Sequence, residues 1–161
     1  MNLSVDGANF IKEREGFKLQ SYQDGAGIWT IGYGHTGKNI KKGILINKKQ
    51  ADDFFSKDIA VFKTALNKLL KYPVSQNMFD AMLSMMYNIG IGNFTNSTLL
   101  RELNKNKGIA TSDMERYFLL FNKITVNGTK VVSPGLTTRR KLEYMIFSEG
   151  NYNAKISVID G

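Results

Sequence analysis

The chain has 161 residues, no cysteine, a single histidine, and 22 basic against 14 acidic side chains, which leaves a formal charge of +8. A chain of this length buries about two-thirds of its unfolded surface, so one core suffices without disulfides. The composition excludes thiol chemistry and a disulfide framework, and one histidine argues against a His-rich metal site. The basic residues form short, scattered clusters, which favours a solvated basic surface over a nucleic-acid-binding stripe.

The N-terminus lacks the basic segment and apolar run of a secretory signal, and no apolar stretch approaches 18 residues. We therefore expect a protein made in the cytoplasm without a signal peptide and without stable membrane insertion.

The first predicted element is a helix over residues 4–14, with Ser4 as its N-cap and Gly16 ending it in a left-handed conformation. A hairpin region follows, with β character at Leu19–Tyr22 and Ile28–Ile31 around a Gly-rich turn. Glycines recur in this region, because glycine permits the backbone conformations that tight turns require.

The clearest helix is predicted over about residues 47–72, after a loop at residues 38–46. Asn47 and Gln50 have the spacing of a capping box, and apolar residues recur at helical spacing up to Pro73.

Past Pro73 the pattern is mostly helical. Ser75 caps a strongly apolar segment, Met78–Ile89, which we expect to be a buried central helix closed by Asn88 and Gly90. The remaining predicted elements are a helix from Ser97 to about Asn106, a helix with a Ser112–Glu115 capping box ending near Asn122, a hairpin at residues 124–132 with an Asn127-Gly128 turn, and a helix at residues 137–148.

These elements predict an α+β, mainly α fold in one domain, with a cleft between two lobes. The expected parts are an N-terminal helix and β lobe at about residues 1–46, a connecting helix at 47–72, a helical lobe at 73–149 and a tail at 150–161. An apolar run in the tail contains Ile156, Val158 and Ile159.

The stretch from Glu15 to Thr36 contains the candidate chemistry. Glycoside hydrolysis requires one carboxylic acid that protonates the leaving oxygen and one carboxylate that activates water or attacks directly. Glu15 at a helix C-terminus, where the helix dipole disfavours negative charge, suits the acid, and Asp24 in a polar turn suits the carboxylate. The alternative is an ordinary surface glutamate, and Thr30 on its own is simply a good strand residue.

Eight residues separate Glu15 from Asp24, five separate Asp24 from Thr30, and a Gly-Tyr-Gly-His-Thr segment follows at 32–36. This pattern resembles that of the phage-type lysozymes, glycoside hydrolase family 24. The resemblance extends over about residues 5–149 and includes Phe79-Asp80-Ala81, Tyr87-Asn88-Ile89-Gly90, the segment 94–99, and Gly135-Leu136 with Arg139, Arg140 and Glu143. It implies a lysozyme-like fold.

The resemblance implies hydrolysis of the β-1,4 bond between N-acetylmuramic acid and N-acetylglucosamine in bacterial peptidoglycan, with no metal or organic cofactor. It implies Glu15 as general acid, Asp24 as the carboxylate that works with water, and Thr30 as a residue that positions this water. An inverting mechanism is expected, with carboxyl groups about 6.5 to 9.5 Å apart.

Other residues have expected supporting roles. Arg139 is expected to face Glu15 across the cleft, where a guanidinium favours the ionised carboxylate and so opposes the dipole. His35 is expected to form a structural ion pair with Asp58. For four further residues two roles are open. Their positions in the family imply that they line the cleft, and the alternative is that they serve only as helix-end and capping residues. They are Thr36, Tyr87, Asn88 and Ser97.

Peptidoglycan is the expected partner, nucleic acid is not, and the basic surface suits an anionic wall. We expect a monomer that reaches the wall through a holin or another export route. A lytic transglycosylase is the first alternative, although it needs no water-holding carboxylate such as Asp24. A non-catalytic wall-binding module of the same fold is the second, and a nucleic-acid binder is the last.

Overall fold

The computed structural model describes residues 1–156 of the chain. Its elements, in chain order, are α1 (Val5–Glu15), β1 (Lys18–Gln23), β2 (Trp29–Gly32), β3 (His35–Thr36), α2 (Lys48–Leu69), α3 (Gln76–Ile89), α4 (Ile91–Thr95), α5 (Thr98–Lys105), α6 (Met114–Leu119), β4 (Lys123–Val126), β5 (Thr129–Val132) and α7 (Pro134–Glu149). The fold is α+β and mainly helical, as the sequence predicts. Val158 and Ile159 of the predicted apolar tail lie outside the described residues.

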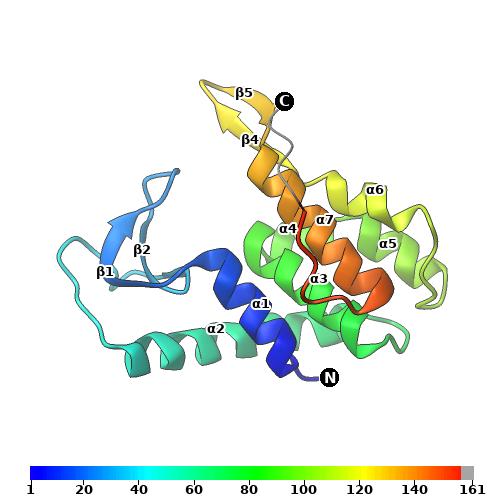
Figure 1. Ribbon diagram of the computed structural model, residues 1–161, viewed down its shortest axis with the longest axis horizontal. Coiled ribbons are helices and arrows are strands. Elements are labelled where there is room, and N and C mark those ends of the chain that lie inside the picture. The colour runs from blue at the N-terminus through cyan, green and yellow to red at the C-terminus, as the bar shows by residue number, and fades with distance from the viewer. Residues whose placement is uncertain (157–161) are drawn as a thin grey trace.

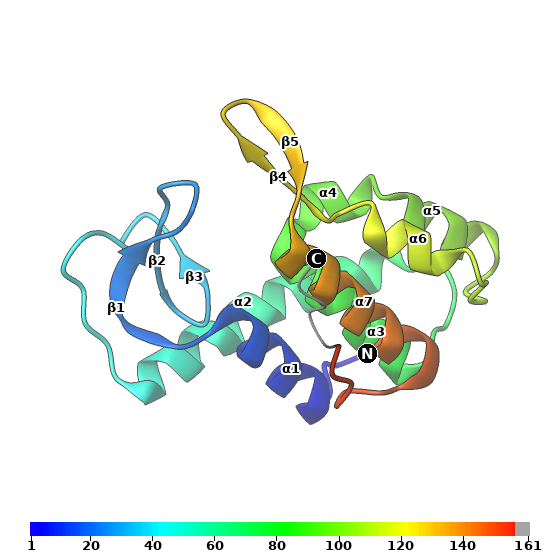
Figure 2. The ribbon, with the colours of Figure 1, turned by 45° about the horizontal axis from the view of Figure 1, so that its top comes forward.

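The small sheet and the helices α3 to α7 occupy opposite ends of the molecule, and α2 runs along both (Figure 1). The sheet is antiparallel in the order β1-β2-β3, and Thr30 on β2 pairs with Tyr22 on one side and Thr36 on the other. The β4–β5 hairpin projects from the helical end (Figure 2). We call residues 17–46 the sheet lobe and residues 73–156 the helical lobe.

Helix α3 is the centre of the helical lobe, as its apolar sequence predicts. Every residue from Met78 to Met86 is buried, and α7 packs closely against this helix. The methionines of α3 fill the core together with phenylalanines from neighbouring helices, such as Phe94, Phe118 and Phe147.

Several predicted caps are confirmed. The side chains of Ser4, Asn47, Ser75 and Ser97 each accept a hydrogen bond from a backbone N–H in the first turn of α1, α2, α3 and α5. Asn47 completes the capping box with Gln50.

In the first half of the chain, two predictions differ from the structure and one strand was not predicted. Gly16 has the expected positive φ of 74°, but its ψ of 178° is extended, because the chain passes directly into β1. Helix α2 ends at Leu69 instead of residue 72, since Asn104 hydrogen-bonds the backbone of both Leu69 and Lys71. The two-residue strand β3 is too short to leave a pattern in the sequence.

Three further corrections concern the helical lobe. The short helix α4 was not predicted. Helix α6 begins at Met114 without a Ser112 cap, because a turn closed by a hydrogen bond from the Met114 N–H to the Thr111 carbonyl already precedes it. Helix α7 begins three residues early, at Pro134, because Ser133 caps it.

A buried carboxylate joins both ends of the described chain to α3. Asp80 is 1% exposed. It accepts hydrogen bonds from the Ser4 backbone and hydroxyl, from Gln76 Nε2 at 2.8 Å and from the Tyr152 hydroxyl at 2.7 Å. Helix α1, which ends at Glu15, is therefore anchored at its N-terminus to the core of the helical lobe.

The contact between α1 and Asp80 leaves no room for a side chain at Gly7. A Cβ at Gly7 would lie 2.7 Å from Asp80 Cγ and 2.8 Å from Leu3 Cδ1, and Asp80 is held in place by its hydrogen bonds. We expect Gly7→Ala to lower the free energy of unfolding by about 1–3 kcal/mol. Urea unfolding measures this, with Gly92→Ala as control because a Cβ there meets no atom within 4 Å. Equal losses in both variants would contradict the prediction.

Candidate active site

A cavity of about 360 Å³ lies between the sheet lobe and the helical lobe. We call it the cleft. The residues that line it are Glu15, Tyr22, Asp24, Thr30, Gly34, Thr36, Asp58, Phe62, Tyr87 and Asn88. The three residues predicted to carry the chemistry thus share one cavity, although they come from a helix, a turn and a strand.

Glu15 is the last residue of α1, and its side chain is 17% exposed. Its Oε1 accepts a hydrogen bond from Arg139 Nη1 at 2.8 Å, the contact expected across the cleft. Gly34 approaches the other oxygen so closely that a Cβ would lie 3.0 Å from Glu15 Oε2. Since Gly34 also has a φ of 77°, only glycine suits this position.

Asp24 lies in the turn between β1 and β2. Its Oδ1 accepts hydrogen bonds from the backbone N–H groups of Ala26 and Ile28, each at 2.9 Å. These two donors hold the carboxylate in a fixed orientation. Asp24 Oδ1 is therefore occupied by the turn, and Oδ2 is the oxygen left for a ligand.

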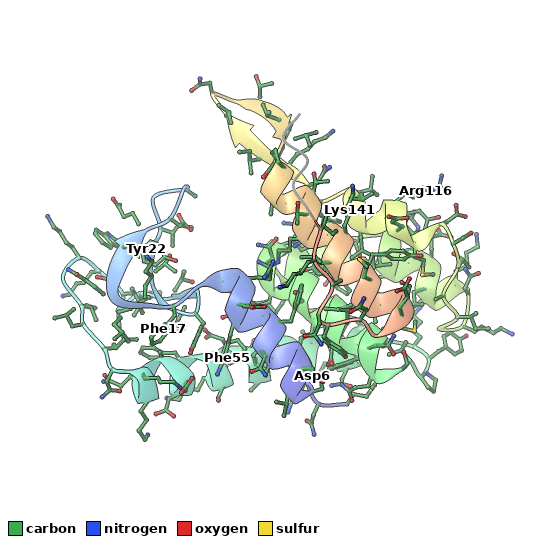
Figure 3. The ribbon with its side chains drawn as sticks, viewed as in Figure 1. Asp6, Phe17, Tyr22, Phe55, Arg116 and Lys141 are labelled. Atoms are coloured by element: carbon green, nitrogen blue, oxygen red, sulfur yellow. The ribbon has the colours of Figure 1, made fainter. Side chains whose placement is uncertain are left out.

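Thr30 and Tyr22, which lie on the sheet, line the same cavity as the two carboxylates. Thr30 is 4% exposed, and its hydroxyl donates to the Ile28 carbonyl at 2.9 Å, which leaves the oxygen as an acceptor. Tyr22 lies on β1 (Figure 3). Burial raises the pKa of Tyr22, and the carboxylates of Glu15 and Asp24 raise it further.

A buried charge network supports Glu15 from the helical lobe. Glu143 on α7 is fully buried; its Oε1 accepts hydrogen bonds from Arg139 Nε at 3.1 Å and from Ser84 Oγ at 2.7 Å. Burial opposes the charge on Arg139, but the carboxylates of Glu143 and Glu15 outweigh it and raise the pKa of Arg139. The guanidinium that contacts Glu15 is thus itself fixed by a second carboxylate.

His35 forms the predicted contact with the connecting helix. Its Nδ1 lies 2.8 Å from Asp58 Oδ2, and its ring stacks on Phe54 with centroids 4.2 Å apart. The pair joins β3 to α2 at the floor of the cleft, and Asp58 also lines the cavity.

Three of the four expected substrate-binding residues line the cleft: Thr36, Tyr87 and Asn88. The expectation for Ser97 was wrong. Ser97 is 3% exposed, and its hydroxyl caps α5 by accepting from the Leu100 N–H, so it does not reach the cavity. Sequence reasoning missed Tyr22 and Phe62 as cleft residues because single aromatic residues on amphipathic elements resemble core residues.

Within residues 1–156, no three His, Asp or Glu side chains gather as metal ligands would. In the same part of the chain, no helix combines the length and apolar character needed to cross a bilayer.

The Tyr87 hydroxyl is expected to make the protein less stable as the pH rises into the alkaline range. Burial, and then the carboxylates of Asp58 and Glu15, raise the pKa of Tyr87, and its hydroxyl donates to the Tyr33 carbonyl at 2.8 Å. Below about pH 10 this hydroxyl is neutral in both states, so its contribution to stability is intact. Above that pH only the unfolded chain loses the proton, and the contribution falls.

We therefore expect wild type to exceed Tyr87→Phe in unfolding free energy by about 1 kcal/mol at pH 8. This advantage should shrink by about 1 kcal/mol at pH 11. Urea unfolding of both proteins at the two pH values measures it, and an advantage that stays constant contradicts the account.

Comparisons with known proteins agree with this architecture. An endolysin of phage FAHEc1 of Escherichia coli O157:H7 superposes with a TM-score of 0.87 at 38% identity and covers 96% of this chain and 98% of its own. The muramidase domain of SpmX from Asticaccaulis excentricus has a TM-score of 0.82 at 32% identity, with 91% and 97% covered. These matches and the cleft between the lobes define a lysozyme-like fold.

The sequence comparisons narrow this class to one family. Residues 12–143 match the phage lysozyme family model. An endolysin of Acyrthosiphon pisum secondary endosymbiont phage 1 is 42% identical over 147 residues, which span 91% of this chain and 98% of that protein. The chain belongs to the phage lysozyme family. Membership supports peptidoglycan hydrolysis in cell lysis as its activity.

Proposed function

We propose that the chain is a muramidase that hydrolyses the β-1,4 bond between N-acetylmuramic acid and N-acetylglucosamine, with inversion of configuration. The observation that supports this most strongly is the presence of Glu15, Asp24 and Thr30 in one cleft. Two carboxylates on opposite sides of a bound sugar are what acid and base hydrolysis requires.

In this proposal the Glu15 carboxyl group donates its proton to the glycosidic oxygen as the bond to the muramic acid C1 breaks. The oxygen leaves as the 4-hydroxyl of N-acetylglucosamine. Arg139 holds Oε1 of Glu15, so the proton is assigned to Oε2, beside Gly34 and the cavity. Arg139 then stabilises the carboxylate that the proton transfer creates.

Asp24 and Thr30 act on the other side of the sugar ring. A water donates one hydrogen bond to Asp24 Oδ2 and one to Thr30 Oγ1, and its oxygen attacks C1 from the face opposite the leaving group. Asp24 accepts the water proton, so the new hydroxyl has the α configuration. The backbone hydrogen bonds to Asp24 Oδ1 and the bond from Thr30 to Ile28 fix both acceptors before the substrate binds.

The named activity of the SpmX domain supports a muramidase. Two other functions remain as alternatives. A lytic transglycosylase uses the 6-hydroxyl of muramic acid in place of water, and a wall-binding module needs no acid. A turn that orients Asp24 and a threonine beside it favour hydrolysis over both.

Mass spectrometry of fragments from permeabilised Gram-negative walls tests the proposal. Hydrolysis gives fragments with reducing muramic acid ends, each containing one added water. Fragments with 1,6-anhydro ends would assign a transglycosylase, and a folded protein that binds walls without releasing fragments would assign a binding module.

A further inference from the structure

Asn88 lies near the end of α3, where two cavities meet. It lines the cleft and also a second cavity beneath the β4–β5 hairpin, which Asn93, Lys123 and Lys130 line as well. A side chain in this position contacts a ligand that extends from the cleft toward the hairpin.

The orientation of the Asn88 amide is fixed from the protein interior. Arg140 on α7 is fully buried, and its Nη2 donates to Asn88 Oδ1 at 2.7 Å. Its Nε lies 2.9 Å from Glu143 Oε2, which holds the guanidinium in place. Because a guanidinium has only donors, the oxygen of the amide must face Arg140. The NH2 group of the exposed Asn88 consequently faces the cavities.

We propose that Arg140 is a positioning residue that fixes Asn88 as a hydrogen-bond donor to an amide carbonyl oxygen of the substrate, so that this acceptor determines which wall glycans are cleaved. The inference rests on the proposed function. Peptidoglycan offers amide carbonyls in the acetamido groups of its sugars and in the peptide attached to muramic acid. A sugar without its acetyl group offers an ammonium group, which is a second donor and cannot pair with Asn88.

Asn88→Asp tests this donor directly. The aspartate keeps the shape and keeps an oxygen for Arg140, but presents an acceptor where asparagine presents a donor. We expect its rate on N-acetylated walls to fall about tenfold. When the acceptor is the acetamido carbonyl, its preference for N-acetylated over chemically de-N-acetylated walls falls by a similar factor, because the carboxylate pairs with the ammonium group.

Asn93→Asp is the matched control. It introduces the same charge into the neighbouring cavity, whereas Asn93 itself donates to the Ile89 carbonyl of the preceding turn at 2.8 Å. We expect Asn93→Asp to retain the wild-type preference. Arg140→Gln is a second test, because glutamine both donates and accepts and so permits the Asn88 amide to turn over. A ratio of rates from one sample does not depend on the folded fraction, so a destabilised Arg140→Gln remains informative.

Walls stripped of peptide by an amidase identify which carbonyl is recognised. A loss for Asn88→Asp that persists on peptide-free glycan assigns the acetamido carbonyl, and a loss confined to peptide-bearing walls assigns the peptide carbonyl. A rate on N-acetylated, peptide-bearing walls that is unchanged in Asn88→Asp, or lowered equally in Asn93→Asp, would overturn the inference alone. A folded wild type that cleaves none of these walls would overturn the proposed function itself.

Discussion

Glu15→Gln is expected to reduce wall-clearing activity by about 100- to 10,000-fold, the usual contribution of a general acid. The glutamine carbonyl still accepts from Arg139, so the cleft geometry and the melting temperature should change little. Only the transferable proton is lost. Turbidity loss of permeabilised Gram-negative walls measures the effect.

Glu13→Gln is the control for this variant. Glu13 lies on the same helix, its side chain is 73% exposed, and it contacts Arg14 and not Arg139. Each substitution removes one acidic side chain from a basic protein, so neither weakens the electrostatic attraction to the anionic wall. If Glu15→Gln clears walls as fast as Glu13→Gln, Glu15 is not the acid.

The second large effect is expected on stability. Glu143 is the fully buried carboxylate between Arg139 and Arg140, with contacts of 3.1 and 2.9 Å to their Nε atoms. Glu143→Gln leaves two buried guanidinium groups with less compensating charge and turns an amide donor toward one of them. Breaking a buried ion pair in this way costs about 3–5 kcal/mol of unfolding free energy.

Urea unfolding followed by circular dichroism measures the loss, with Glu149→Gln as the matched variant. Glu149 is the last residue of the same helix and is exposed, so we expect a change within about 0.5 kcal/mol. Equal stability of the two variants would mean that Glu143 does not stabilise the arginines as described.

The sequence predicts the elements that are long or have a clear cap. Helix α2 has a capping box and helical spacing over many residues, and α3 is apolar on most of its surface, so both were predicted close to their observed bounds. Strand β3 and helix α4 contain two and five residues, too few for a periodic pattern. Their position depends on neighbours that are distant in the sequence.

The residues of the site also fall into two groups, those that local sequence predicts and those that only the folded structure brings together. Glu15, Asp24 and Thr30 lie within 16 residues, so their spacing and the family resemblance place them in one cavity. Arg140 and Asn88 are 52 residues apart. Nothing in the local sequence of either residue indicates the hydrogen bond between them, and it follows only from the packing of α7 against α3. Ser97 shows the opposite case, in which a local cap accounts for a residue expected in the cleft.

The configuration of the first product tests the two-carboxylate account most directly. Proton NMR of a soluble peptidoglycan fragment, recorded before mutarotation, distinguishes the anomers at the new reducing end. Water activated by Asp24 predicts the α anomer of muramic acid from the β-linked substrate. Early accumulation of the β anomer would contradict this account, because retention requires a covalent intermediate or an equivalent double displacement instead of direct attack by water.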